Sequence, residues 1–505
     1  MIAELATIPM NPMSHFAPTM AAARAGDASS SGADSPIPLR SPDVDDGYRG
    51  IRFCIWVYFF LLIFEGSLRK WVLPGSSNLL LVVRDPVVAV CYFIALRNGK
   101  FPKGPFVLSA LILGIACLVT SFAVNALKNG QNMFLITGFG FHANFFHLPV
   151  IFLIRDAFDR RRLRAIGKWV LWIAPFTAVL IFLQYRSSGE AWVNHGAGKD
   201  AGQLWVGVGG LDKVRPAGFF SYNTGNAAYL SWVAAFLLNA ILIRTNVISR
   251  KTVIISAIAL ASAGSLSISR TCAMSIVVVF AAGTFCMMLA PKLANRSVLI
   301  AFLAGALCLL ASRFSVFGEA IGILQQRVED AGGIRQGGVA RFLDGFAEPF
   351  RVLEKAESLG IGLGMGTNAA GGLLTGERQF MAGTENEWAR HFLESGMVLG
   401  GLYILWRIAL VIQLLRVSLK ALRTLNPLPM LLFSSCALLV LIGPVGIPMT
   451  LGFVVMGAGM TLAAAKEVEM ATDGDRVLME VQQPQKRLVR GRSPYAEQLH
   501  AGRKA

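Results

Sequence analysis

Long apolar runs, separated by short polar segments, dominate the pattern of this chain. Most of the runs reach or approach the roughly 20 residues that a helix needs to cross a bilayer, and the shorter ones must borrow flanking residues. The pattern therefore predicts an all-α polytopic membrane protein with about twelve transmembrane helices. The predicted spans are 52–64, 79–96, 105–123, 132–154, 169–185, 226–243, 252–268, 271–290, 298–312, 392–415, 429–446 and 448–465.

The composition favours the same fold class. Hydrophobic residues make up 54% of the chain and charged residues 15%, which lies well outside the average of soluble domains. All seven cysteines stand inside apolar runs and lack metal-ligand spacing. We interpret them as small buried hydrophobic residues, without a disulfide framework.

The chain has a formal net charge of +17. The positions of the basic residues along the chain are more informative than this total. Lysine and arginine concentrate in alternate connections between the predicted spans, and the positive-inside rule assigns those connections to the cytoplasm. We therefore predict a multi-pass membrane protein with both termini cytoplasmic. The basic residues then serve topology and attract anionic lipids, and we expect no nucleic-acid partner.

This topology predicts the organisation of the chain. Residues 1–50 are expected to form a disordered cytoplasmic tail, 51–466 the transmembrane domain, and 467–505 a basic cytoplasmic tail. Two long periplasmic loops are predicted within the membrane domain, at 187–217 and 313–391. Structureless loops of this length in a compact protein are usually functional.

Outward-facing arginines run against the charge bias and call for a reason. Arg215 lies in the first long loop, Arg341 in the second, and Arg270 in a tight outward turn. The planar guanidinium presents a fork of donors that suits phosphate oxygens. Arginines beside acidic residues are expected to pair with them instead. Arg270 has no nearby acid in the sequence, and for it and Arg215 both a phosphate-binding and a structural role stay open.

The stretch "TENEWARHFLESGMVLGGL", at 384–402, places several ionisable groups directly before an apolar segment. Such groups are costly in hydrocarbon, so they are candidates for function. A simpler interpretation is a capping box, with Thr384 as the N-cap and Glu387 at the third helical position. Both interpretations can hold together, because a cap also fixes the rotation of the helix.

Other polar residues of the membrane domain are expected to be structural. Glu65 and Arg69 form an i,i+4 pair, and with Arg84 and Asp85 they predict an ion cluster at the outward ends of the first two spans. His142 and His147 are five positions apart, off a shared α-helical face, so we interpret them as packed polar residues rather than metal ligands. We predict no metal site.

The alternating glycines of "GIGLGMG", at 360–366, lack the spacing of a dinucleotide-binding motif and do not follow a strand. Glycine lets a backbone approach a ligand closely, or it makes a loop mobile. The motif alone does not decide between these interpretations.

Four segments together resemble the O-antigen ligase and polymerase superfamily. They are "RPAGFFSYNTGNAAYLS" (215–231), "SLSISRTCAMSIVV" (265–278), "GIGLGMGTN" (360–368) and "ENEWARHFLESGMVLGG" (385–401). In the last segment, the residues that match the family's signature in register are Asn386, Trp388, Glu394, Gly396 and Gly400. Their order and spacing, more than any single segment, carry the resemblance.

The resemblance implies a GT-C-like membrane glycosyltransferase with a long periplasmic loop between the ninth and tenth spans. Such enzymes transfer a glycan from a polyprenyl diphosphate to an acceptor hydroxyl with inversion, without metal or cofactor. The implied partners are the polyprenyl-diphosphate-linked glycan, the growing glycan acceptor and other polysaccharide-export proteins. The products would be O-antigen or exopolysaccharide, made at the outer face of the bacterial inner membrane.

The resemblance also assigns residues to roles. The diphosphate would be bound by Arg215, Arg270 and Arg341. Glu385 stands where the family has a histidine, so it becomes the candidate general base, with Asn386 and Glu394 supporting it. His391 is six residues further along, about 240° around a helix, and should face elsewhere. The missing histidine favours a polymerase over a ligase.

Two other functions remain open. A transporter or flippase of lipid-linked saccharide would also need many spans and intramembrane arginines, although such proteins usually contain related halves, and no internal repeat is visible here. A catalytically inactive partner in a polysaccharide synthase complex is the third alternative, and the missing histidine favours it.

Overall fold

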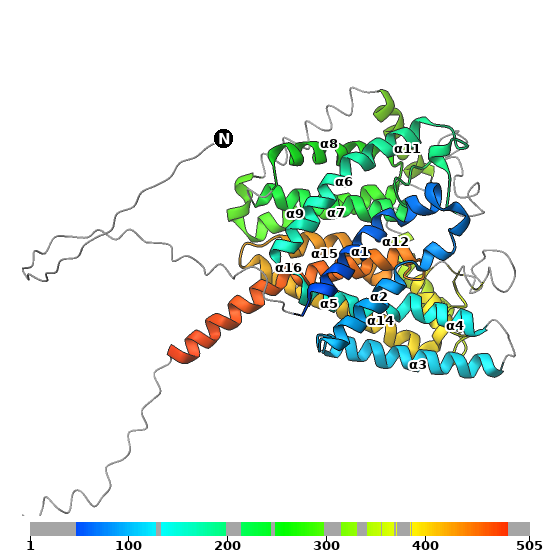
Figure 1. Cartoon of the computed structure of the whole chain (residues 1–505). Helices are drawn as coiled ribbons and strands as arrows, with labels where there is room; N and C mark the ends of the chain where they lie inside the picture. The colour runs from blue at the N-terminus through cyan, green and yellow to red at the C-terminus, as the bar shows by residue number, and fades with distance from the viewer. Residues whose placement is uncertain are drawn as a thin grey trace, which may run out of the picture. The chain divides into compact units, whose positions relative to one another are not determined.

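A computed structural model describes residues 47–127, 133–197, 214–243, 248–296, 315–330, 341–354, 356–367, 370, 384 and 386–482. Within these residues the chain forms helices and no strand (Figure 1). The elements are α1 (Arg49–Ser67), η1 (Leu68–Val72), η2 (Pro74–Ser76), η3 (Leu79–Val82), α2 (Asp85–Arg97), α3 (Pro105–Leu127), α4 (Met133–Phe141), η4 (His142–Phe146), α5 (Leu148–Ala157), α6 (Arg160–Arg186), η5 (Trp192–Asn194), α7 (Asn223–Leu242), α8 (Arg250–Leu266), α9 (Arg270–Leu289), η6 (Pro291–Arg296), α11 (Ser315–Asp330), α12 (Arg341–Leu353), α14 (Glu387–Leu422), α15 (Leu428–Ile442) and α16 (Pro448–Gln482).

The prediction of an all-α polytopic membrane protein is confirmed. Among the described residues, nine helices are long and apolar enough to cross a membrane. The predicted spans at 252–268 and 429–446 correspond to α8 and α15, which have 17 and 15 residues and are shorter than a full span. The predicted span at 298–312 lies outside the described residues.

Two helices form the centre of the membrane domain. In the most apolar stretch of α16, 100% of the residues are buried inside the protein, and in that of α7 the share is 89%. In α9 the share is only 22%. α16 packs against α5, α14 and α15, and α7 packs against α9 and α15. Small residues allow this close packing, since a Cβ atom on Gly459 would lie 2.8 Å from Ile154 and one on Gly457 would lie 2.6 Å from Cys436.

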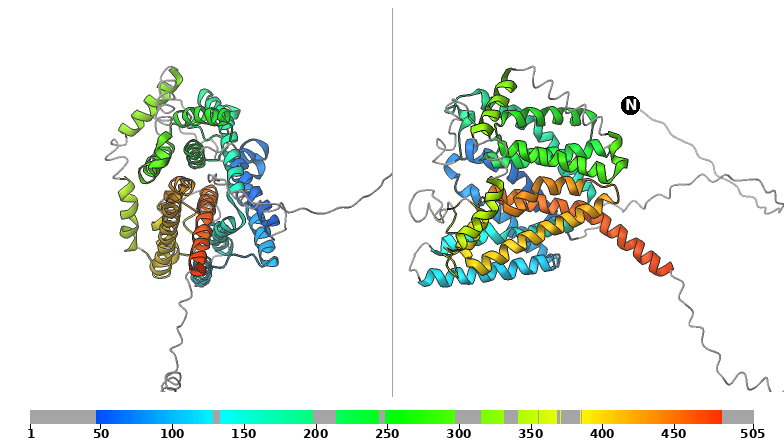
Figure 2. Two further views of the ribbon diagram at one scale, coloured as in Figure 1. Left: turned by 90° about the vertical axis from the view of Figure 1, so that its left-hand side faces the viewer. Right: turned by 180° about the vertical axis from the view of Figure 1, so that it is seen from behind.

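The boundaries of the predicted loops and tails differ in part from the observed elements. Within the predicted loop at 313–391, the chain forms α11 and α12, so this region is not structureless. α16 continues as one helix past the predicted boundary at 466 (Figure 2). Residues 1–46 and 483–505, which hold most of the two predicted tails, lie outside the described residues.

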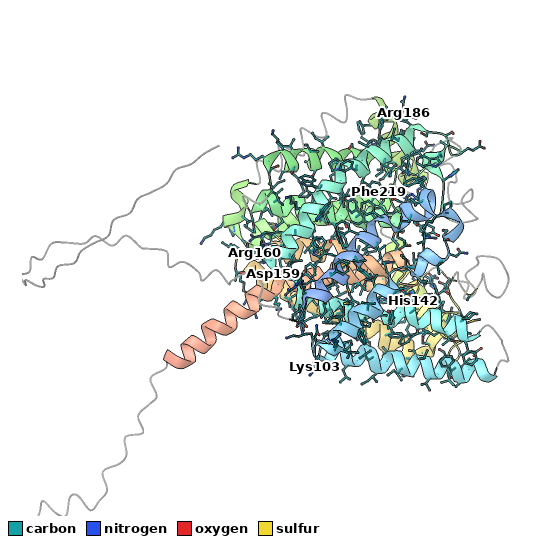
Figure 3. All side chains as sticks on the ribbon, in the orientation of Figure 1. Lys103, His142, Asp159, Arg160, Arg186 and Phe219 are labelled. Atoms are coloured by element: carbon teal, nitrogen blue, oxygen red, sulfur yellow. The ribbon has the colours of Figure 1, made fainter. Side chains whose placement is uncertain are left out.

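The ends of the helices agree with the charge pattern of the sequence. Figure 3 shows Lys103, before α3, and Arg160, at the start of α6, at the same end of the helices, with Arg186 at the opposite end of α6. Asp159 caps α6 by accepting a hydrogen bond from the backbone N–H of Arg162 at 2.9 Å. Two of the basic segments assigned to one membrane face therefore lie together.

Three interruptions of regular helix lie in the described part of the membrane domain. Two are π-helical turns, η1 after α1 and η4 after α4. The third is in α14, where Gly396 has φ 74° and ψ 173°. Interruptions of this kind often mark functional positions, and each of these three carries or adjoins ionisable side chains.

Candidate functional site

The chain reverses direction within α14. Glu387 and Arg407 are 20 positions apart, yet Glu387 Oε1 lies 3.2 Å from Arg407 Nη1, whereas a straight helix would separate them by about 30 Å. The left-handed backbone at Gly396 makes the reversal possible, because such conformations favour glycine. A Cβ atom on Gly400 would lie 2.6 Å from the carbonyl oxygen of His391, so the two limbs touch through this glycine. The predicted span at 392–415 therefore crosses a break.

The start of α14 differs from the predicted capping box. The N-cap is Asn386, whose side-chain oxygen accepts hydrogen bonds from the backbone N–H groups of Trp388 (3.0 Å) and Ala389 (3.1 Å). Thr384 instead donates a hydrogen bond to Glu348 Oε1 at 2.6 Å. Since the helix begins two residues later than predicted, Glu387 occupies its first turn with a buried side chain, and the capping-box prediction is wrong.

Glu387 is the centre of a buried ionic cluster, which we call the α14 cluster: Glu387, Arg390, His391, Glu394 and Arg407. Glu387 Oε1 lies 2.8 Å from Arg390 Nη2, 3.1 Å from His391 Nε2 and 3.2 Å from Arg407 Nη1. Arg390 Nη1 lies 2.9 Å from Glu394 Oε2. Two carboxylates thus face two guanidinium groups, and mutual compensation is what allows buried charges in a membrane domain.

The glycine-rich segment packs onto the break in α14. The backbone N–H groups of Ile361 and Gly362 donate to the carbonyl oxygens of Leu393 (2.8 Å) and Glu394 (3.0 Å), which the break releases from helical hydrogen bonds. A Cβ atom on Gly366 would lie 2.6 Å from Cγ of Arg390. The close approach that the sequence suggested is therefore made to the helix break and the α14 cluster.

Two of the predicted site residues, Asn386 and Glu394, are described in the first part of α14 and at its N-cap. Asn386 caps the helix and donates to the carbonyl oxygen of Gly345 in α12 at 2.6 Å. Glu394 belongs to the α14 cluster. Glu385 lies outside the described residues, between Thr384 and Asn386. Arg341 begins α12, and its side chain is not among those described.

Arg215 and Arg270 are carried by two neighbouring parts of the helix bundle, the segment that leads into α7 and the start of α9. Burial and, after it, the charge of Arg270 lower the pKa of the Arg215 guanidinium. Arg215 precedes α7 and Arg270 opens α9, and these two helices pack side by side. When the side-chain amide of Asn223 is oriented with its oxygen toward Arg215, that oxygen accepts a hydrogen bond from Arg215 Nε at 3.2 Å.

Further cations surround the segment 214–222 before α7. Lys70 Nζ donates to the carbonyl oxygen of Gly218 at 3.0 Å, and Arg69 Nη1 donates to Ser221 Oγ at 3.1 Å. Glu65 is shared between Arg69 (3.5 Å) and Arg84 (3.3 Å), which confirms the predicted ion cluster for these three residues. We call Arg69, Lys70, Arg215 and Arg270 the basic cluster.

Asp85 contacts two histidines instead of joining the Glu65 cluster. Its carboxylate oxygens lie 3.2 Å from His142 Nδ1 and 3.0 Å from His147 Nε2, and the two imidazole rings stack with centroids 5.4 Å apart. The expectation that the histidines face different ways is wrong because the helix between them is the π-helical turn η4. A π turn brings residues five apart onto one side.

Backbone and side-chain contacts join these clusters through the interior. Arg390 Nη2 donates to Asn144 Oδ1, at 2.9 Å, in the same π turn that carries His142. The connection between α15 and α16 contacts both regions, since Val445 donates its N–H to Glu387 Oε1 at 3.2 Å and Pro448 accepts from Arg84. The groups of ionisable residues are therefore linked through shared backbone segments, namely η4 and the connection that leads into α16.

Sequence reasoning missed the α14 cluster as a unit. One available signal was Arg407, a cation in the middle of a predicted span, since such residues usually have a buried partner. Comparisons with protein-family models, curated proteins and solved structures found no match for this chain. Functional inference therefore depends on the geometry and the sequence motifs.

Proposed function

We propose that this chain is an inner-membrane glycosyltransferase that polymerises or ligates glycan units carried on a polyprenyl diphosphate. The observation that carries the proposal is that Arg215 precedes α7 and Arg270 opens α9, two helices that pack side by side, although the two arginines belong to separate family-like segments of the sequence. Arginines fixed beside a diphosphate stabilise the negative charge that develops on the leaving group. Arg69 and Lys70, in η1, donate hydrogen bonds to Ser221 and Gly218 in the segment between Arg215 and α7, so two more basic side chains lie next to that segment.

In the proposed reaction, an acceptor hydroxyl attacks the anomeric carbon of the lipid-linked glycan. The new glycosidic bond forms as the bond from that carbon to the diphosphate oxygen breaks, with inversion. The leaving polyprenyl diphosphate keeps the electron pair beside Arg215 and Arg270, and the hydroxyl proton passes to Glu385 as general base. Diphosphate is a good leaving group, so we expect the arginines to contribute more than the base.

The contacts between α12 and α14 support a shared site for Arg341 and Glu385. Asn386, next to Glu385, donates to Gly345, and Gly345 lies four residues, about one helical turn, after Arg341. Thr384 contacts Glu348 in the same helix. This junction between α12 and α14 would hold the general base, Glu385, and a residue that binds the diphosphate, Arg341, at the same end of the helices.

The proposal includes a membrane topology. It assigns about twelve spans, both termini in the cytoplasm, and the chemistry to the periplasmic face, as in GT-C-like enzymes. The substrates would be the lipid-linked glycan and the growing acceptor, and neither a metal nor a cofactor would take part in the glycosyl transfer. Other polysaccharide-export proteins would be its partners.

The test replaces Arg215 and Arg270 singly by alanine and by lysine in a strain that depends on this chain for polymer formation. We expect alanine to abolish the polymer ladder while the protein stays in the membrane, and lysine to rescue poorly because it lacks the bidentate fork. Lys251→Ala, on the exposed surface at the start of α8, is the matched control. Normal polymer from both alanine variants would overturn the assignment.

The interrupted helices favour one alternative. Transporters of lipid-linked substrates commonly use broken helices around their binding site, and α14 is broken at Gly396. A flippase would move labelled lipid-linked saccharide across a liposome bilayer without extending the glycan, whereas the proposed enzyme would extend it. An inactive partner in a synthase complex would do neither alone.

A further inference from the structure

Asp85, His142 and His147 bring one carboxylate and two imidazoles together from two separate parts of the chain. One ligand atom from each residue can be chosen so that all three lie within 4.8 Å of one another. Asp85 begins α2, and the histidines stand at the start and just after the end of η4. Figure 3 labels His142, the member of the set on the π turn.

The spacing of the ligand atoms fits a small transition-metal ion. Zn²⁺ bonds to histidine nitrogen and carboxylate oxygen at 2.0–2.2 Å, so neighbouring ligands in a tetrahedral site are about 3.3 Å apart. The carboxylate oxygens of Asp85 lie 3.2 Å from His142 Nδ1 and 3.0 Å from His147 Nε2. These two spacings are therefore close to those of a tetrahedral site.

The π turn accounts for this geometry. In a regular α-helix, residues five apart point about 140° away from each other, and His142 and His147 could not share one ion. The wider turn of η4 puts both rings on the side that faces Asp85. The π turn, a rare form of helix, is therefore what lets both histidines and Asp85 face one point.

A second layer of contacts orients His147. Tyr58 Oη lies 3.0 Å from His147 Nδ1. When Nδ1–H donates to the tyrosine oxygen, the lone pair of Nε2 faces Asp85, which is the tautomer that binds a metal. Histidine ligands in metal sites commonly have such a partner on their other nitrogen.

Access and nearby charge are also compatible with an ion. The side chain of Asp85 is 25% exposed, while that of His147 is 2% exposed, so the site is open on the carboxylate side. Arg84 is a neighbouring cation, since its Nη1 atom lies 3.5 Å from Tyr58 Oη. Glu65 Oε2, 3.3 Å from Arg84 Nε, partly offsets this charge.

We propose that Asp85, His142 and His147 form a binding site for a divalent transition-metal ion of the zinc class. The ion would join α2 to η4 and so stabilise the π turn, which also carries Asn144, the partner of Arg390 at 2.9 Å. The site is distinct from the proposed diphosphate residues, and the ion takes no part in the glycosyl transfer proposed above.

The experiment uses the full chain, purified in detergent with an affinity tag that contains no histidine and stripped of metal by a chelator. Titration with Zn²⁺ alone, followed by calorimetry, should show one ion per chain, and Co²⁺ alone should give the visible absorption bands of a low-symmetry site. Asp85→Asn, His142→Gln and His147→Gln should each remove the binding. Tyr58→Phe should weaken it by about 10- to 100-fold, the usual effect of losing a second-layer contact.

His195→Gln is the matched control, because this histidine is exposed and outside the set, and it should bind Zn²⁺ as the unmodified chain does. If the ligand variants do not fold, the Co²⁺ spectrum and X-ray absorption of the unmodified protein still decide the question, since they report two nitrogen ligands or none. Absence of stoichiometric binding, or unchanged binding in the ligand variants, would overturn the proposal. Lost binding in His195→Gln would do the same.

Discussion

Glu394 Oε1 accepts a hydrogen bond from the backbone N–H of Gly366 at 2.8 Å. The same carboxylate binds Arg390 through Oε2 at 2.9 Å, so the glycine-rich segment and the broken helix α14 form one structural unit. In the sequence they are two loose motifs, separated by residues outside the described parts of the chain. The hydrogen bond between Gly366 and Glu394 therefore joins two motifs that are separate in the sequence.

This contact predicts that Gly366 cannot be enlarged. In Gly366→Ala the new Cβ atom would lie 2.6 Å from Arg390 Cγ and 2.8 Å from Glu394 Oε1, so the arginine must shift within its cluster. We expect a loss of about 1–3 kcal/mol of stability, the usual cost of overpacking. Thermal unfolding of the purified protein in detergent measures it.

The matched control is Gly318→Ala in α11, where a Cβ atom meets nothing within 4 Å. Alanine is a better helix former than glycine, so this control should leave stability unchanged or raise it slightly. Equal unfolding temperatures for the two variants would contradict the close packing of Gly366 against the α14 cluster.

Glu387 should matter for stability far more than a helix cap does. Glu387→Gln removes the charge that faces Arg390, His391 and Arg407 and leaves guanidinium groups incompletely compensated in the protein interior. Breaking a buried pair in this way costs about 3–5 kcal/mol, against about 1 kcal/mol for a lost cap. The yield of monodisperse protein and its unfolding temperature should both fall.

Glu354→Gln, at an exposed position after α12, should not change either measurement. An unfolding temperature of Glu387→Gln within a degree or two of that of the control would mean that the α14 cluster is not the ionic core described here. Arg407→Leu combined with Glu387→Leu should recover part of the loss, because replacing both charges leaves neither one uncompensated.

The fold class was predictable because a bilayer imposes one requirement on every span, namely a long apolar helix. The reversal at Gly396 was not, because the sequence "LESGMVL" reads as a continuous helix until the positive φ of the glycine is known. The histidine pair was missed for the same reason, since an α-helical period was assumed across the π turn η4. Both the reversal at Gly396 and the convergence of the two histidines depend on local backbone geometry, which the pattern of residue types does not indicate.

Some contacts near the candidate site were predictable, whereas the assignment of Arg215 and Arg270 to a diphosphate stays a prediction. The Glu65 and Arg69 pair followed from helical spacing. By contrast, the contact between Arg390 and Asn144 joins residues 246 positions apart, and no local pattern in one sequence indicates such a pair.

The topology makes a direct prediction. Lys103 and Arg186 are exposed and lie at opposite ends of the helices (Figure 3). An impermeant thiol reagent should therefore label Arg186→Cys in spheroplasts, and Lys103→Cys only after lysis. The six native cysteines described are buried and provide a low background. Labelling of both positions from the same side would remove the basis for periplasmic arginines.

Glu385 provides the sharpest separation between chemistry and structure. It lies next to Asn386, the N-cap of α14, and the proposed function makes it the general base. Glu385→Gln keeps the shape of the side chain but accepts no proton, so turnover of lipid-linked glycan should fall by about 10²- to 10⁴-fold, with the unfolding temperature unchanged. Glu385→His should retain activity, because it restores the residue of the resembling family.

Asn386→Ala is the control, since loss of the cap should cost about 1 kcal/mol of stability without the same loss of turnover. A purified Glu385→Gln protein that extends the glycan at the normal rate would leave this chemistry to the arginines alone.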